Sequence, residues 1–218
     1  MSAILQAFKD ADLRKKIIFT IVMIIAYRIG AQIPSPGVDY ASIAGRLRTL
    51  TEESGNLYSV INLFSGGALL QLSIFAIGIM PYITASIIVQ LLTVVIPHFE
   101  QLKKEGQSGQ AKMTQYTRYL TLALAILQSS GIVALADREQ LLGQGVAVLA
   151  EDRNFFTLIS LVITMTAGAI LVMWMGELIT EKGIGNGMSL LIFAGIATRL
   201  PTDGVSCLLY TSPSPRDA

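Results

Sequence analysis

One face of a predicted helix in the first half of the chain carries aliphatic side chains at its middle and polar ones towards its later end. At about 100° per residue, its five members fall within a sector of about 80°. Polar side chains that face lipid lack hydrogen-bonding partners, so a polar stripe of this kind needs either water or partners on a neighbouring helix. The face therefore suits a water-filled funnel that narrows to an aliphatic collar, or equally an interface between helices. Its members are Ile79, Ile83, Ser86, Gln90 and Thr93.

A second aliphatic pair lies near the end of the chain, where Met188 and Ile192 are four residues apart on one predicted helix face. The pair follows the glycine-rich run GIGNG at 183–187. Glycine runs can cradle phosphate at a helix N-terminus, but this one lacks the preceding strand and the lysine of a phosphate-binding motif. We therefore predict a tight turn that lets the chain leave one long helix and begin the next.

The residues that enzymatic chemistry would need are absent or badly placed. A serine protease within a membrane needs a base for its nucleophile, and the one histidine, His98, stands beside Pro97 at the predicted end of a span. An aspartyl protease needs two buried Asp side chains, and no predicted span contains one. The sequence has no GxxxxGK[ST] motif for ATP and lacks a set of metal ligands. We predict no enzyme activity, no cofactor and no metal.

These faces belong to a chain with the composition of a membrane protein. Of its 218 residues, 52% are hydrophobic and 14% are charged, whereas soluble domains carry about 25% charged residues. Charge-free blocks cover 54–97, 119–136, 154–176 and 183–198. A soluble helical bundle would show polar residues at every third or fourth position of each helix, and these blocks do not. The composition therefore predicts an all-α integral membrane protein.

We predict five transmembrane helices and one short re-entrant helix. The first 16 residues, which end in three basic side chains, are predicted to form a cytoplasmic amphipathic lead-in. Residues 207–218 continue no span, and we interpret them as a foreign or artefactual tail. The predicted spans are 17–33, 74–96, 116–136, 154–175 and 184–200.

The charge-free block 54–97 is interrupted twice. Its 44 residues are twice the ~20 that one spanning helix needs, yet it contains the run SGG at 65–67 and Pro81. A segment at about 60–71 would reach only about 18 Å, which is short of the ~30 Å membrane core. We predict that this segment is re-entrant and lies in a cavity, the alternative being a helix on the membrane surface. Pro81 could bend the second span.

The distribution of Lys and Arg predicts that the N-terminus is cytoplasmic. The segments that would then lie inside, 1–16, 97–118 and 176–183, hold nine of these residues. The outside loops, 34–60 and 137–153, hold four. An odd number of spans is common in one half of a channel or transporter that is built from inverted repeats.

Three long segments follow one another in a fixed order: NLFSGGALLQLSIFAIGIMPYITASIIVQLLTVV, KKEGQSGQAKMTQYTRYLT and GELITEKGIGNGMSLLIFAGI. Together they resemble the SecY family, the central subunits of the bacterial Sec protein-conducting channel. The similarity runs from about residue 8 to 205. Because that family has ten spans in two inverted halves, residues 17–206 resemble its N-terminal half.

The resemblance implies a role for each candidate residue. Four aliphatic residues would belong to a pore ring of six, and three polar ones would line the cytoplasmic funnel. Spans 74–96 and 116–136 would form one side of a lateral gate towards lipid. The implied ring positions are Ile79, Ile83, Met188 and Ile192. The implied funnel positions are Ser86, Gln90 and Thr93. The implied plug, which would seal the pore from outside, is Asn62, Leu63, Phe64, Ser65, Gly66, Gly67, Ala68 and Leu69.

The resemblance also implies a function. Unfolded secretory polypeptides would cross the bacterial plasma membrane, and membrane proteins would enter its lipid. The implied partners are SecE and SecG in the membrane, and the SecA ATPase or a ribosome in the cytoplasm. Half of an inverted-repeat secondary transporter is the alternative, which would place an ionisable residue near the membrane midplane. The charge within the first apolar block, Arg28, stands near its outer end, where it can snorkel.

Overall fold

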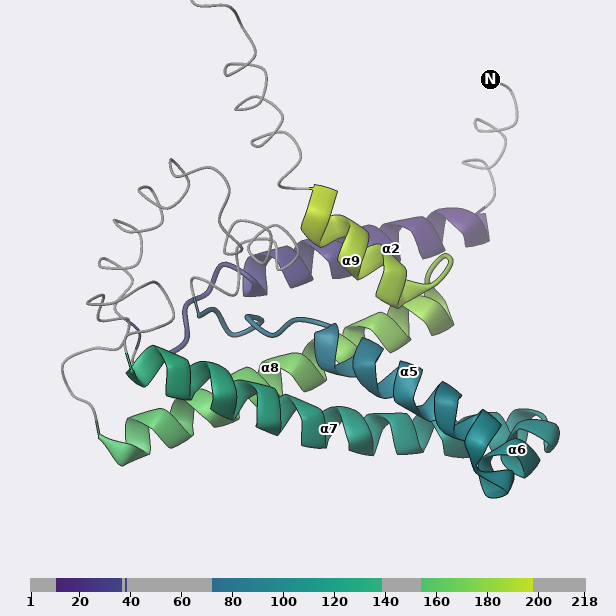
Figure 1. The fold of residues 1–218 in the computed structure, drawn as a ribbon. Helices are drawn as coiled ribbons and strands as arrows, with labels where there is room; N and C mark the ends of the chain where they lie inside the picture. Colours follow the sequence, from purple (N-terminus) through teal and green to yellow (C-terminus); the bar gives the residue numbers. More distant parts are fainter. Residues whose placement is uncertain (1–10, 37, 39–71, 139–153, 198–218) are drawn as a thin grey trace, which may run out of the picture.

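The computed structural model describes residues 11–36, 38, 72–138 and 154–197, and the regular elements within these ranges are α-helices (Figure 1). The predicted plug at 60–71 and the tail at 207–218 lie outside the described residues. The helices are α2 (Ala11–Gly30), α5 (Met80–Val95), α6 (Pro97–Lys104), α7 (Gln107–Asp137), α8 (Phe155–Lys182) and α9 (Gly187–Ala197).

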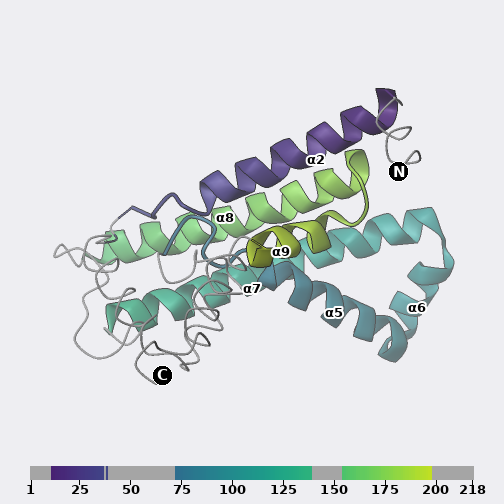
Figure 2. The same ribbon diagram turned by 90° about the horizontal axis from the view of Figure 1, so that it is seen from above.

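α7 and α8 lie at the centre of the described bundle. α5 packs along α7, while α2 and α9 pack along α8 (Figures 1 and 2). The hydroxyls of Ser129 on α7 and Thr166 on α8 are 3.0 Å apart and both side chains are buried. This contact joins two helices that run in opposite directions.

Two of the described helices, α7 and α8, are long and apolar enough to cross a membrane. α5 and α6 make a third span if that pair, bent by 100°, counts as one. α2 carries four charged residues in its first six positions and a fifth, Arg28, near its end, and α9 has eleven residues. The all-α membrane class is therefore confirmed, and the number of five spans stays a prediction.

The outer surface of these helices is apolar, whereas hydroxyl groups are buried between them. Val94 on α5 is 83% exposed, and Leu127 on α7 and Ile163 on α8 are also exposed. Thr121 on α7 is fully buried, and its hydroxyl donates to the backbone carbonyl of Thr117. Apolar side chains outside and satisfied polar groups inside suit a bundle that lies in lipid.

α5 begins later than the sequence pattern predicts. The predicted span starts at residue 74, but residues 72–79 are irregular and the helix starts at Met80. Gly78 has a φ of 59°, a left-handed conformation that glycine adopts without steric cost. Pro81 lies in the first turn of α5, where a helix needs no N–H from it. The expectation that Pro81 bends the span is therefore wrong, since the helix begins there instead.

The irregular segment 72–79 is enclosed by protein, as non-helical backbone in a membrane must be. The Ile74 N–H donates to the Ile33 carbonyl, and the Leu72 carbonyl accepts from the Ser35 N–H, both at 3.0 Å. Leu72 also belongs to an apolar cluster with side chains of α7 and α8. The segment thus satisfies its backbone against the end of α2 and brings the chain to the start of α5.

The predicted tight turn between the last two helices is confirmed. α8 ends at Lys182, α9 begins at Gly187, and Gly185 between them has a φ of 71°. The Asn186 side-chain oxygen accepts the N–H of Met188 at 3.0 Å, which satisfies one of the unpaired donors at the start of α9. This turn folds α9 back along α8 and fixes where Met188 points.

Candidate functional site

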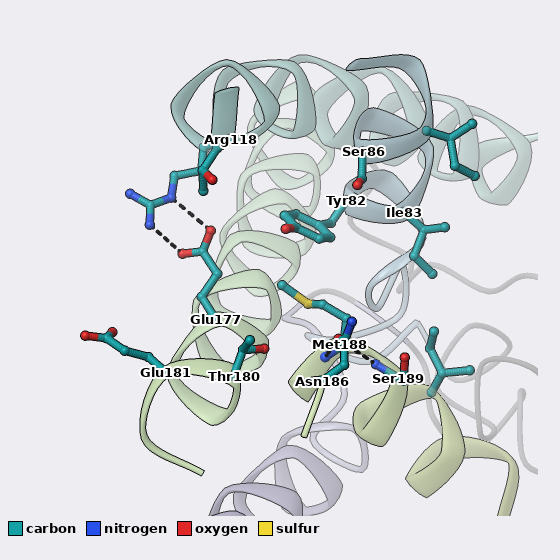
Figure 3. A pocket seen from close by; sticks show the side chains of 13 residues that line it. Tyr82, Ile83, Ser86, Arg118, Glu177, Thr180, Glu181, Asn186, Met188 and Ser189 are labelled. Atoms are coloured by element: carbon teal, nitrogen blue, oxygen red, sulfur yellow. Dashed lines mark hydrogen bonds and ion pairs between the residues drawn. The ribbon is translucent and has the colours of Figure 1, made fainter. Parts of the chain in front are cut away.

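A cavity of about 530 Å³ lies where α5, α7, α8 and α9 meet (Figure 3). One side is apolar and is formed by Ile83 and Ile87 of α5 with Met188 and Ile192 of α9. The other side is polar and carries groups from α7 and α8. Segments more than a hundred residues apart in the sequence therefore share one site.

The structure brings the four predicted ring residues together. Ile83, Met188 and Ile192 line the cavity. Ile79 precedes α5 as its N-cap residue and is 7% exposed, so it is buried next to the cavity rather than on its lining. All four belong to one apolar cluster around Val172 of α8. Two aliphatic pairs more than a hundred residues apart in the sequence thus pack into one apolar cluster.

The three predicted funnel residues lie in three different surroundings. Ser86 lines the cavity, whereas Gln90 is exposed outside its lining and Thr93 is buried. The Thr93 hydroxyl donates to the Gln90 carbonyl at 2.6 Å. Thr93 continues the buried stripe of α5, whose members recur every four residues and drift by about 40° per step. That drift leaves Thr93 only about 20° from Ser86 around the helix, so the face that opens on the cavity at Ser86 is covered by packing seven residues further along. The buried stripe is Pro81, Ala85, Val89 and Thr93.

The polar side of the cavity contains an ion pair that the sequence analysis did not predict. Arg118 of α7 donates from Nε to Glu177 Oε1 of α8 at 2.9 Å, and its Nη2 lies 2.8 Å from Oε2 (Figure 3). Both residues flank charge-free blocks, since Arg118 precedes 119–136 and Glu177 follows 154–176. Opposite charges at the same predicted membrane side of two consecutive spans were the signal that could have revealed the pair.

Close backbone contacts hold α9 against α8 beside this ion pair. A Cβ added at Gly176 would collide with the Met188 sulfur, and one added at Gly187 would collide with the Gly176 carbonyl. The Gly187 N–H donates to the Thr180 hydroxyl at 2.9 Å. The contact at Gly187 is with backbone and requires glycine, whereas the Met188 sulfur next to Gly176 belongs to a flexible side chain. Gly187 therefore fixes where α9 begins and Met188 with it.

The lining combines an apolar side with a charged one. The apolar side offers dispersion contacts, and two of the three charged groups, Arg118 and Glu177, are paired with each other. Within the part of the chain that the structure describes, no three His, Cys, Asp or Glu side chains come together to hold a metal ion.

The fold and the site together define a multi-pass α-helical membrane protein with a cavity between its helices that is apolar on one side and polar on the other. The family model described as SecY matches residues 73–213. The chain belongs to the SecY family, which confirms the resemblance seen in the sequence.

The curated relatives extend this assignment over nearly the whole chain. The protein translocase subunit SecY of Corynebacterium glutamicum is 85% identical over 208 residues, covering 95% of this chain and 47% of the relative. The SecY subunit of Mycobacterium tuberculosis strain H37Rv is 60% identical over 210 residues, with the same coverage of both chains. The chain thus spans about half the length of the curated relatives it matches.

Two solved structures share the fold at low sequence identity. Sec61 in the canine ribosome-channel complex from the endoplasmic reticulum has a TM-score of 0.58 at 16% identity, covering 92% of this chain and 43% of that chain. A structure of a protein-conducting channel has a TM-score of 0.56 at 17% identity, covering 92% and 42%. The helix arrangement is therefore that of one part of a larger channel fold.

Proposed function

We propose that this chain supplies one half of a protein-conducting channel, through which unfolded secretory polypeptides cross the bacterial plasma membrane. Membrane proteins enter the lipid through the same subunit. The observation that carries the proposal is the cavity at which Ile83, Met188 and Ile192 meet beside Ser86. The names of the relatives, translocase subunits, support the assignment of a transport role to this cavity.

The chemistry of the constriction is passive. Aliphatic side chains form no hydrogen bonds with a passing chain, so they adapt to different sequences, while an unhydrated ion finds no ligand among them. Methionine is unbranched and pliable, so Met188 suits a ring that must change its diameter. Ile79 lies in the same apolar cluster and supports the ring from behind. The energy for transport comes from partners, the SecA ATPase or a translating ribosome.

The remaining parts of the proposal concern the surroundings of the cavity. Residues 62–69 act as the plug, and the five spans 17–33, 74–96, 116–136, 154–175 and 184–200 run from a cytoplasmic N-terminus. Ser86 lines the cytoplasmic funnel, with Gln90 and Thr93 further along the same helix. SecE and SecG bind in the membrane, and a second half-channel completes the ring. The exposed apolar faces of α5, α7 and α8 support contact with lipid or with these partners.

Complementation tests this proposal. Residues 1–206 are co-expressed with the remaining length of the Corynebacterium glutamicum relative in a strain of that organism depleted of its own SecY. We expect at least partial rescue of growth and secretion with both halves, and no rescue with residues 1–206 alone, because four ring positions leave the ring open. Rescue by 1–206 alone, or failure of the paired halves despite membrane insertion of both, would contradict the proposal.

A further inference from the structure

The cavity has two walls, each built from a pair of packed helices. α5 and α7 form one wall and carry Tyr82 and Ile83 on the cavity side. α8 and α9 form the other and carry Met188 and Ile192. The width of the constriction therefore depends on how the α5–α7 wall sits against the α8–α9 wall.

The Arg118–Glu177 ion pair joins these two walls at the cavity. Its two parallel N–O contacts, 2.9 Å and 2.8 Å long, have the bidentate geometry that makes arginine–carboxylate pairs directional. The Glu177 side chain is only 17% exposed, while that of Arg118 is 52% exposed. A pair that is fixed in orientation and half-shielded from water contributes more than a mobile surface pair.

The Arg118–Glu177 ion pair and the hydroxyl contact between Ser129 and Thr166 fit the same antiparallel alignment of α7 and α8. Moving eleven residues along α7, from Arg118 to Ser129, moves eleven residues back along α8, from Glu177 to Thr166. At 1.5 Å per residue the two ties lie about 16 Å apart along the helices. Two separated polar contacts resist both sliding and pivoting of α7 on α8, and they add to the apolar packing between the two helices.

Glu177 also follows directly after Gly176, which contacts the predicted ring residue Met188. The Gly176 carbonyl packs against Gly187 at the start of α9. A displacement of this turn of α8 therefore acts on the start of α9 through the Gly176–Gly187 contact, and Met188 follows Gly187 directly. On the other wall, α7 carries Arg118 and packs along α5, which carries Ile83.

We propose that Arg118 and Glu177 are positioning residues for the constriction: their bidentate ion pair holds the wall that carries Ile83 at a fixed distance from the wall that carries Met188. The proposal rests on the channel function for the meaning of the constriction. The positioning itself is a property of the two walls and is measured separately from transport.

The test uses the full chain co-inserted with the second half of the Corynebacterium glutamicum relative, in a Cys207→Ser background. The variants are Glu177→Gln, which keeps the shape and removes the charge, and the exchange Arg118→Glu with Glu177→Arg. Glu100→Gln is the matched control, because it breaks the exposed pair that Glu100 forms with Lys104 elsewhere on the chain. Two quantities are measured per inserted molecule: the ion leak of sealed vesicles, and the rate of bismaleimide cross-linking between Ile83→Cys and Met188→Cys.

We expect Glu177→Gln to raise the leak and to change the cross-linking rate by about fivefold, the factor that a single weakened contact makes in a two-state equilibrium. The exchange variant should return both quantities towards those of the unaltered chain, and Glu100→Gln should change neither. Unaltered leak and cross-linking in Glu177→Gln would overturn the proposal, as would an exchange variant as leaky as Glu177→Gln.

The failure of the channel function gives a different result. In that case the unaltered pair of halves would neither export protein nor show a leak that depends on the constriction. The cross-linking rate would still report whether Glu177→Gln moves one wall against the other. The positioning role and the channel function therefore fail independently.

Discussion

α8 and α5 line the same cavity but are held in opposite ways. α8 buries ten of its 28 residues, and α2, α7 and α9 all pack against it. α5 buries four of its sixteen residues, and its later half exposes Val94 and Val95. The enclosed helix is positioned by glycine contacts and polar ties, whereas the exposed helix is positioned mainly by one apolar stripe against α7. In this bundle the position of a helix is therefore set by close packing. Exposed apolar side chains indicate only that a helix faces lipid or a partner.

The largest expected effect breaks the packing of the enclosed helix. A Cβ added at Gly168 of α8 would collide with the backbone carbonyl of Ile74 in the irregular segment. A backbone atom cannot rotate away as a side chain can, so Gly168→Ala should cost about 3 kcal/mol, the upper end for overpacking. The free energy of unfolding in detergent micelles, measured by denaturant titration, checks this value.

Gly131 supplies the matched control on α7. A Cβ at Gly131 would meet nothing within 4 Å, so Gly131→Ala should leave stability unchanged or raise it by up to about 1 kcal/mol through better helix propensity. Equal effects of the two substitutions would show that the enclosed and open sides of the bundle do not differ as described.

A smaller effect tests the polar tie between α7 and α8. Thr166→Val keeps the shape of the side chain and removes the hydroxyl that lies 3.0 Å from that of Ser129. Hydrogen bonds between membrane helices contribute about 0.6 kcal/mol on average and up to about 1.7 kcal/mol, so the loss should fall in that range. Unfolding in micelles measures it, and the double variant with Ser129→Ala should cost less than the two single variants together.

Ser130, the residue after Ser129 on α7, provides a control for the hydroxyl contact between α7 and α8. Ser130 is exposed, and its hydroxyl donates to the Leu127 carbonyl of its own helix. Ser130→Ala should therefore change the free energy of unfolding by less than Ser129→Ala. A larger loss for Ser130→Ala would mean that hydroxyl groups on α7 act through their own helix and not across the interface.

Much of the helical framework could be read from the sequence, because charge-free blocks report the membrane directly. The blocks 119–136 and 154–176 predicted the centres of α7 and α8, but both helices extend beyond them into polar sequence. Helical hydrogen bonds do not stop at the membrane surface, so α7 begins as early as Gln107. Hydropathy alone could not place these ends.

Two features of the site lay beyond the sequence for different reasons. A helical wheel records only the angle around the axis, and it correctly placed Thr93 within about 20° of Ser86; it could not show that this face is open at Ser86 but buried at Thr93, about 10 Å further along α5. The start of α5 was missed because 74–79 is as apolar as the helix that follows. Only the left-handed Gly78 and the first-turn Pro81 separate the irregular segment from the helix. Apolar composition cannot distinguish buried loop from buried helix when both lie within one membrane segment.

The smallest expected effect lies at the exposed end beyond α5, where α6 turns away by 100°. The Lys104 ammonium donates to the Glu100 carboxylate at 2.6 Å, and this hydrogen bond and the Lys104 charge lower the pKa of Glu100. A lowered pKa means that the pair favours the folded helix above the ordinary pKa of glutamate, and that this contribution is lost as the pH falls through the folded value.

Carboxyl ¹³C NMR of Glu100 should show a higher pKa in Lys104→Gln than in the unaltered chain, and the difference should shrink in high salt because both side chains face water. Identical titration of Glu100 in the two proteins would mean that the contact does not persist in solution. Since exposed pairs of this kind contribute little, the unfolding of the bundle should not register the change, in contrast to the substitutions on α8.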